Sequence, residues 1–331
     1  MRLPPCLFAS LVWLAVSASP AVPAAPIPVV FDTDIGGDID DTWALSLLLR
    51  SPELDLRLVT TDHGNTRYRA RVAARLLEAA GRSDVPVGIG LMQAGDEGGQ
   101  SEWVRGYDLA RYPGRVHEDG VQALIDTVMG STEPVTVIAV GPAPTLAAAL
   151  AREPRLAGRA RFVGMYGSLR RGYDGKPEPE AEWNVKADAA AARAVLSAPW
   201  IEATVTPLDT CGVVQLRGER YARVRESRDP LARAVMDNFR LWCPRQDWCA
   251  GDPEHVAAKS STLFDTVAVY LAFARDLVVT EDLGVRVTDD GMTVPDPKGR
   301  PIRWAVDWKD RAAFEELLVR RLIGEKAGAP R

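Results

Sequence analysis

The sequence predicts a single-domain α/β protein in which helices cover both faces of a mainly parallel sheet. Two observations indicate this fold. Short apolar runs alternate with helical patterns along most of the 331 residues, as expected for successive strand–helix units. In addition, no Gly/Ser linker, charge run or internal repeat divides the chain. The hydrophobic fraction of 47% is typical of globular proteins and supplies enough apolar side chains for one packed core.

The elements follow one another in regular order. The expected strands are short apolar runs, which suit strands buried on both faces; they lie at 27–31, 56–61, 85–89, 135–140, 162–165 and 203–208. The helices between them are indicated by buried, amphipathic or alanine-rich patterns at 43–49, 67–80, 121–129, 145–152 and 187–196. Gly81 ends the second helix, because glycine favours the position after a helix.

Three stretches depart from this alternation. Residues 95–120 are polar, glycine-rich and aromatic, and long segments of this kind usually form lids or binding loops. Residues 231–263 are mostly helical in pattern and carry two tryptophans and two cysteines. Near the C-terminus, 285–288 and 302–306 are expected to form an antiparallel pair, followed by a helix over 311–323.

The N-terminus has the features of a secretory signal peptide. Arg2 precedes an apolar core over Leu7–Val16, and small residues follow up to Ala25, which is the usual order of such segments. We expect a signal peptide at 1–25, a catalytic domain at 26–325 and a short tail at 326–331, in a secreted or periplasmic protein. An uncleaved N-terminal anchor is the alternative. No later stretch is long and apolar enough to cross a membrane, so no membrane association is expected after cleavage.

Charge and cysteine content narrow the function further. The net charge of -5 gives no support for a nucleic-acid-binding surface. Export would permit a disulfide, and Cys243 with Cys249 is the natural pair, leaving Cys211 free. A zinc site is not expected, because no histidine lies at ligand spacing from a cysteine pair.

The segment from Phe31 to Asp41 is the strongest functional signal. It holds five carboxylates within ten residues, between an apolar strand and an apolar helix. The acids therefore lie at the carboxyl end of a strand, where ligands bind in open α/β sheets. Carboxylates this close repel one another unless a cation binds them, and hard oxygen ligands favour Ca²⁺ or Mg²⁺. The alternative is a solvated acidic turn that caps the following helix.

Other strand ends carry polar residues as well. The segments are Thr61–Asn65, Val140–Thr145, Ala181–Asn184 and Leu263–Tyr270. Asp265 is the most informative of them, because a lone carboxylate in an apolar helix start is costly unless it is paired or ligated. It fits an N-cap on its own, and together with the first acidic segment it fits a distant metal ligand.

In these motifs the chain resembles the inosine-uridine-preferring nucleoside hydrolase family. The similarity runs from about Ile27 to Ile323, and it rests on the ordered set Asp32–Asp41, Gly64–Asn65, Gly141–Pro142, Met165–Gly167, Ala181–Asn184 and Asp265–Tyr270. The resemblance implies a nucleoside-hydrolase-like fold, a bound Ca²⁺ and hydrolysis of the N-ribosidic bond to ribose and free base. It also implies a small-molecule riboside as partner and a possible homodimer or homotetramer.

The resemblance further implies roles for individual residues. Asp40 matches the general base, which takes a proton from the water that attacks the anomeric carbon. Asp34, Asp41, Asp265 and the backbone carbonyl of Val140 match the calcium ligands. The residues that match the substrate-binding positions are Asp38, Asn65, Met165, Glu182, Trp183 and Asn184, with the role of Asp38 open because Asp38–Ile39 lengthens the first motif.

The leaving-group side departs from the family. A histidine often precedes the last calcium-binding aspartate there, but this chain has Phe264, which cannot donate a proton. We expect aromatic side chains to stack on the base instead, which favours purine or activated ribosides. The possible base contacts are Trp103, His117, Trp242, Trp248 and Phe264.

Two other functions fit parts of the sequence. Val30–Asp34 resembles the nucleophile strand of haloacid-dehalogenase-type phosphatases, but no matching downstream aspartate pair is present and a motif without its context is weak support. A catalytically silent, calcium-bound ribose- or nucleoside-binding protein would explain Phe264. Retention of both Asp40 and Asp41 argues for the enzyme, because a binding protein needs no base beside its metal.

Overall fold

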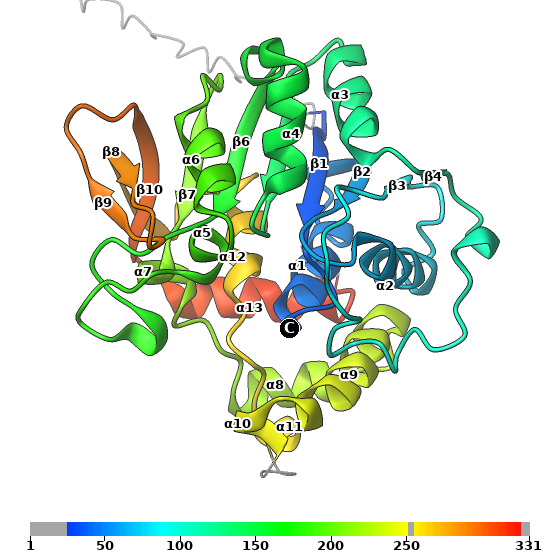
Figure 1. Cartoon of the computed structure of the whole chain (residues 1–331). Coiled ribbons are helices and arrows are strands. Elements are labelled where there is room, and N and C mark those ends of the chain that lie inside the picture. The colour runs from blue at the N-terminus through cyan, green and yellow to red at the C-terminus, as the bar shows by residue number, and fades with distance from the viewer. Residues whose placement is uncertain (1–24, 251–254, 326–331) are drawn as a thin grey trace, which may run out of the picture.

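A mixed, mostly parallel sheet forms the centre of this computed structural model, which describes residues 25–250 and 255–325 (Figure 1). Within these residues the sheet has ten strands in the order β4-β3-β2-β1-β5-β6-β7-β10-β8-β9. The strands are β1 (Ile27–Thr33), β2 (Leu54–Thr61), β3 (Val87–Gly88), β4 (Val116–His117), β5 (Val135–Ala139), β6 (Ala160–Met165), β7 (Ala203–Thr206), β8 (Val278–Val287), β9 (Thr293–Pro295) and β10 (Pro301–Trp308). All neighbours from β4 to β10 pair in parallel, and β8 pairs antiparallel with β10 and with β9.

Helices cover both faces of the sheet, because successive side chains of each strand point to opposite faces. On β1, Val30 packs into the apolar cluster formed with α3 (Gly120–Gly130), α4 (Pro144–Arg152) and α6 (Ala189–Ser197). Val29 and Phe31 belong to the opposite cluster. The helices on that face are α1 (Asp40–Leu49), α2 (Thr66–Ala79), α12 (Phe264–Leu271) and α13 (Arg311–Leu322).

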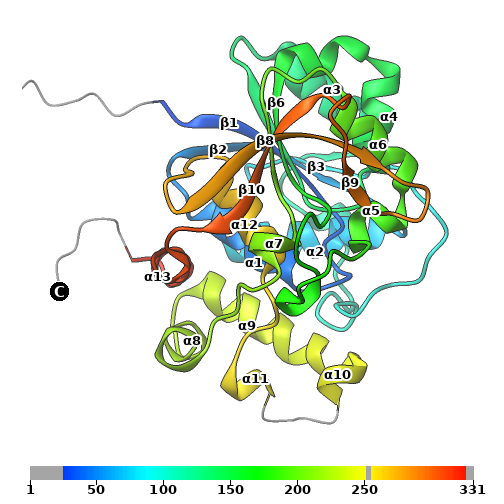
Figure 2. The ribbon, with the colours of Figure 1, turned by 90° about the vertical axis from the view of Figure 1, so that its left-hand side faces the viewer.

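A further group of helices extends beyond α1 and α12 on the second face (Figure 2). It comprises α8 (Gly218–Arg225), α9 (Pro230–Trp242), α10 (Asp247–Ala250) and α11 (His255–Ala258). Cys243 and Cys249 are joined by a disulfide between α9 and α10, and Cys211 is free and buried. The expected pairing of the cysteines is therefore present in the structure.

The predicted single-domain α/β fold is confirmed, with local differences. The helix expected over 187–196 is α6, which begins after Asp188 because the Asp188 side chain accepts from Ala191 N and caps it. A short helix α5 (Trp183–Ala187) that was not expected precedes it. The expected long loop over 95–120 contains the short edge strand β4, which pairs with β3. A short helix α7 (Leu208–Cys211) follows β7.

The expected antiparallel pairing of the two C-terminal strands is present, but it uses the earlier residues of the first strand. Residues 285–287 pair with β9, whereas β10 pairs with the earlier part of β8, where Ile302 lies opposite Leu283. The reason is that β8 is ten residues long, so its two halves pair with different strands. Between them, β8, β9 and β10 form the antiparallel edge of the sheet.

The expected signal peptide and C-terminal tail lie outside the described residues, apart from Ala25. Among the residues that are described, no helix combines the length and apolar character needed to cross a membrane.

The strand order reverses direction between β1 and β5. From β1 the chain moves outward through β2, β3 and β4, then returns to place β5 on the other side of β1. The loops after β1 and β5 therefore leave in opposite directions and open a crevice at their carboxyl ends. Asp62, at the end of β2, stabilises this crevice: its carboxylate accepts from the backbone N–H groups of Ala143 and Thr145, at the start of α4.

Candidate active site

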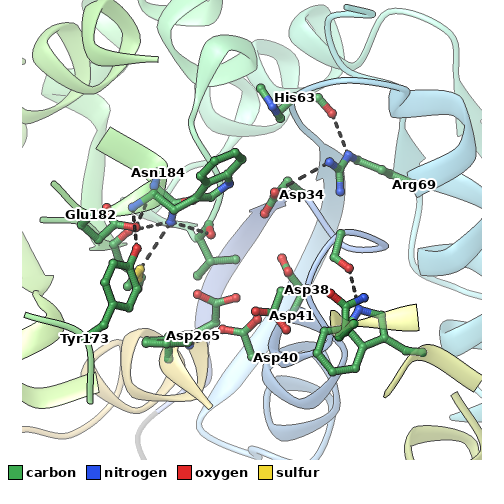
Figure 3. Close-up of a pocket in the computed structure, with 17 residues that line it drawn as sticks. Asp34, Asp38, Asp40, Asp41, His63, Arg69, Tyr173, Glu182, Asn184 and Asp265 are labelled. Atoms are coloured by element: carbon green, nitrogen blue, oxygen red, sulfur yellow. Dashed lines mark hydrogen bonds and ion pairs between the residues drawn. The ribbon is translucent and has the colours of Figure 1, made fainter. Parts of the chain in front are cut away.

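A cavity of about 350 Å³ lies at this switch point, beyond the carboxyl ends of β1, β5 and β6 (Figure 3). Side chains from the loops after these strands converge on it with side chains from α9 and α12. The lining residues are Asp34, Gly37, Asp38, Asp40, Asp41, His63, Arg69, Val140, Met165, Tyr173, Glu182, Trp183, Asn184, Trp242, Gln246, Phe264 and Asp265. The sequence motifs that were far apart in the chain therefore meet in one place.

The acidic segment forms a turn between β1 and α1. Asp40 and Asp41 are the first two residues of α1, where negative charge is favoured by the helix dipole. Thr33, the last residue of β1, donates its hydroxyl to Asp41 and so fixes that carboxylate. Gly36 adopts a φ of +106°, and a Cβ there would lie 2.8 Å from the Tyr68 ring, so this turn requires glycine.

Three carboxylates come closest together. One oxygen from each of Asp40, Asp41 and Asp265 lies within 4.8 Å of the other two, and all three residues are buried. The expected ligand Asp34 also faces the cavity but does not belong to this group; its carboxylate lies 3.7 Å from the Arg69 guanidinium. The compact group therefore includes the expected base and differs in this respect from the ligand set inferred from sequence.

Burial and mutual repulsion disfavour ionisation of these acids. Burial is the main cause that raises the pKa of Asp40, Asp41 and Asp265 well above the usual range, and neighbouring aspartates raise it further. A bound cation would reverse this effect, because it stabilises the ionised carboxylates.

The donor set fits a hard divalent cation. It offers carboxylate oxygens from two separate segments and the backbone carbonyl of Val140, which lines the same cavity. Oxygen-only coordination of this kind suits Ca²⁺ better than zinc or copper. The Val140 carbonyl already accepts from Asn184 Nδ2 at 3.0 Å, and its second lone pair remains available for an ion.

Glu182 and Asn184 form the opposite wall. The Glu182 carboxylate accepts from the backbone N–H groups of Gly167, Asn184 and Val185 at 2.7–3.2 Å and caps α5. The Asn184 amide donates to the carbonyls of Val140 and Met165, each at 3.0 Å. These bonds fix both side chains at the ends of β5 and β6. They act as structural supports and also present polar atoms to the cavity.

Aromatic side chains line the rest of the cavity. Tyr173 packs edge-on against Phe264, with ring centroids 6.0 Å apart. Its hydroxyl accepts a hydrogen bond from the backbone N–H of Trp183 at 2.8 Å. Trp183 is 58% exposed, whereas Trp242 is buried and donates its indole N–H to Gly37 O at 2.8 Å. The cavity thus has an acidic part and an aromatic part, which suits a ligand with a hydroxyl-rich portion and a flat portion.

Three expected site residues, Asn65, Trp103 and His117, do not line the cavity. Asn65 accepts from Tyr68 N with its side-chain oxygen and caps α2. Trp103 is buried and packs beneath Arg75, whose guanidinium carbon lies 4.8 Å from the ring centroid. His117 lies on the edge strand β4, two strands away from β2. The Trp248 side chain lies outside the described part of the structure.

Sequence reasoning also missed four residues that face the cavity, namely His63, Arg69, Tyr173 and Gln246. His63 follows β2, a position that the strand-end pattern marks. The neighbouring Gly64–Asn65 motif, however, assigned the substrate-binding role to Asn65. Arg69 lies one turn into α2 and reaches back to the acidic turn. No local pattern distinguishes Tyr173 or Gln246, because their approach to the cavity depends on how distant segments fold together.

Comparisons with known proteins give a consistent result. Residues 29–316 match the family described as inosine-uridine preferring nucleoside hydrolase. The pyrimidine-specific ribonucleoside hydrolase RihA of Citrobacter koseri is 30% identical over 324 residues, covering 89% of this chain and 98% of that protein. RihA of Photobacterium profundum is 27% identical over 316 residues, covering 89% and 98%.

Solved structures share the fold. The plant nucleoside hydrolase PpNRh1 superposes with a TM-score of 0.75 at 23% identity, covering 90% of this chain and 99% of that one. The purine-preferring ribonucleoside hydrolase of Gardnerella vaginalis superposes with a TM-score of 0.73 at 22% identity, with the same coverage.

The site predicts how stability depends on pH in the absence of metal. Burial raises the pKa of Glu182 from 4.5 to about 7. As pH rises between these values, the unfolded chain releases this proton before the folded chain does, so the free energy of unfolding should fall. We expect Glu182 to contribute a loss on the order of 3 kcal/mol. Urea unfolding in a chelator at pH 5 and pH 7.5 should show a smaller loss for Glu182→Gln than for the wild type; equal losses would contradict the prediction.

Proposed function

The chain belongs to the inosine-uridine preferring nucleoside hydrolase family and is therefore an N-glycosidic hydrolase of ribonucleosides. From this premise we propose that it is an exported, calcium-dependent enzyme that favours purine or activated ribosides. The observation that carries the calcium dependence is the buried group of Asp40, Asp41 and Asp265. Membership of this family excludes the phosphatase alternative.

Asp34, Asp41, Asp265 and the Val140 carbonyl would hold the Ca²⁺, with Asp40 beside the ion. When bound, the ion would orient a water molecule and lower its pKa. Asp40 would then act as the general base that removes a proton from the attacking water. Its position in the compact group supports this role, because the base must lie within hydrogen-bond reach of that water.

The ribose would lie between the acidic group and the wall formed by Glu182 and Asn184. The bond from the anomeric carbon to the base breaks through a transition state with oxocarbenium character, and nearby carboxylates stabilise the positive charge that develops. Water attacks directly in this scheme, so no covalent enzyme intermediate forms. The hydrogen bonds that hold Glu182 and Asn184 keep the polar wall fixed while the ribose changes shape.

The base would occupy the aromatic part of the cavity. Tyr173, Trp183, Trp242 and Phe264 offer flat or edge-on surfaces there, which favour stacking with a purine ring. Phe264 supplies no proton, so a base that leaves readily should react best. The two RihA relatives are named pyrimidine-specific, so the substrate test must compare purine with pyrimidine ribosides.

The general-base role predicts the effect of Asp40→Asn. This change keeps an oxygen in the compact group but removes the proton acceptor, so kcat should fall by roughly 10²- to 10⁴-fold while calcium still binds. Asp41→Ala is the matched comparison, because it removes a ligand and should weaken calcium binding and lower the melting temperature together. Steady-state kinetics and calcium titration distinguish the two; near-wild-type turnover by Asp40→Asn would transfer the base role to Asp38.

The aglycone site predicts a substrate order. At saturating calcium, inosine or adenosine should have a higher kcat/KM than uridine, and p-nitrophenyl riboside should be cleaved without any acid. Release of free base or p-nitrophenol measures this order. A clear preference for uridine would contradict the stacking argument, and a failure to cleave p-nitrophenyl riboside with calcium bound would favour a silent binding protein.

The export proposal rests on the apolar segment after Arg2. Expression of the full chain in a Gram-negative host should give a periplasmic protein whose N-terminus begins after the small residues at Ala18–Ala25. N-terminal sequencing of the fractionated protein tests this; an intact Met1 on a cytoplasmic product would refute export.

A further inference from the structure

The carbonyl groups of the acidic turn are fixed by side chains from outside it. Four successive carbonyls, from Ile35 to Asp38, each accept a hydrogen bond. The donors are Arg69 Nη1 to Ile35 O at 3.2 Å, Tyr68 Oη to Gly36 O at 3.0 Å, Trp242 Nε1 to Gly37 O at 2.8 Å and Gln100 Nε2 to Asp38 O at 2.6 Å. The turn is thus held from α2, from α9 and from the segment that contains Gln100.

Gln100 connects the acidic turn with α1 and α9. Its side-chain nitrogen donates to Asp38 O, and its side-chain oxygen accepts from Thr42 Oγ1 on α1 at 3.0 Å and from Asn238 Nδ2 on α9 at 2.6 Å. Gln100, Thr42 and Asn238 are all fully buried. Each of these bonds is protected from water, and the loss of one would leave a buried polar group unpaired.

The backbone before Gln100 also touches the acidic turn. A Cβ added at Gly98 would lie 2.2 Å from Gly36 O, so the two segments are in direct contact. Trp103, the next large side chain, is buried as well. Residues 98–103 are therefore packed against the site as part of its support, which differs from the free lid that the sequence pattern suggested.

We propose that Gln100 is a positioning residue that holds the acidic turn in its calcium-binding arrangement and couples that turn to α9. This inference rests on the proposed calcium dependence. Without the ion, ionised carboxylates of Asp34, Asp40 and Asp41 would repel one another, which favours an open turn. The hydrogen bond from Gln100 to Asp38 O opposes this opening. Of the four carbonyls that are held in this way, Asp38 O lies nearest in the chain to the start of α1. A turn that is already closed binds the ion with less loss of conformational freedom.

The test is the calcium affinity of Gln100→Met, in which methionine keeps the length of the side chain but neither donates to Asp38 O nor accepts from Asn238. We expect the dissociation constant for calcium, measured by isothermal titration of chelator-stripped protein, to rise roughly 10- to 100-fold. Excess calcium should restore much of the riboside hydrolysis. Gln122→Met is the matched control, because the Gln122 side chain on α3 hydrogen-bonds with Asp126 and Arg152 at the surface; its calcium affinity should remain at the wild-type value.

Thermal unfolding in a chelator separates this effect from damage to the fold. If Gln100→Met does not fold, Asn238→Ala serves instead, because it removes one of the two hydrogen bonds to the Gln100 oxygen without touching the turn, and it should weaken calcium binding by roughly threefold or more. Equal calcium affinity of the folded variant and the Gln122→Met control would overturn the positioning role. A wild-type protein that binds no calcium would instead refute the proposed function on which the inference rests.

Discussion

Mutual repulsion among buried carboxylates is the constraint on which the rest of this structure depends. Asp40, Asp41 and Asp265 are brought within a few ångströms of one another in a region that excludes most water. Such an arrangement opposes folding unless a cation binds or protons remain on the acids. The surrounding framework has to hold the acids in place against this force, and much of the architecture near the switch point contributes to that task.

The framework acts on the backbone of the acidic turn and leaves its carboxylates facing the cavity. Side chains from α2, α9 and the segment around Gln100 bind successive carbonyls, while Thr33 fixes Asp41 directly. These carbonyls are engaged by other side chains, and the carboxylates of the turn line the cavity. The disulfide between Cys243 and Cys249 closes the chain just after Trp242, so the α9 support is itself joined covalently to α10.

The two parts of the cavity are built differently. The acidic part and the wall of Glu182 and Asn184 lie at strand ends and helix starts, and the side chains of Glu182 and Asn184 are held by hydrogen bonds with the backbone. The aromatic part combines Tyr173, Trp242 and Phe264 from three separate segments. Rigid elements position catalytic groups more accurately than loops do, so chemistry can be retained in the first part while specificity varies in the second.

The sequence by itself determined the α/β fold, the order of the main strands and the acidic turn. It could do so because apolar period and strand-end position are local properties. It also marked Asp265, a lone carboxylate at the start of an apolar helix, and Glu182–Asn184, a polar segment before a helix that matches the family motif.

Only the tertiary structure decided which residues surround the cavity. It showed that Asn65 caps α2, that Trp103 is packed under Arg75, and that Tyr173 and Gln246 reach the site. It also separated Asp34, beside Arg69, from the compact group of three aspartates. Most of these outcomes depend on contacts between segments that are separate in the chain, such as that of Asp34 with Arg69 or of Tyr173 with Phe264. Local patterns carry no information about such contacts, because the packing of whole helices against the sheet creates them.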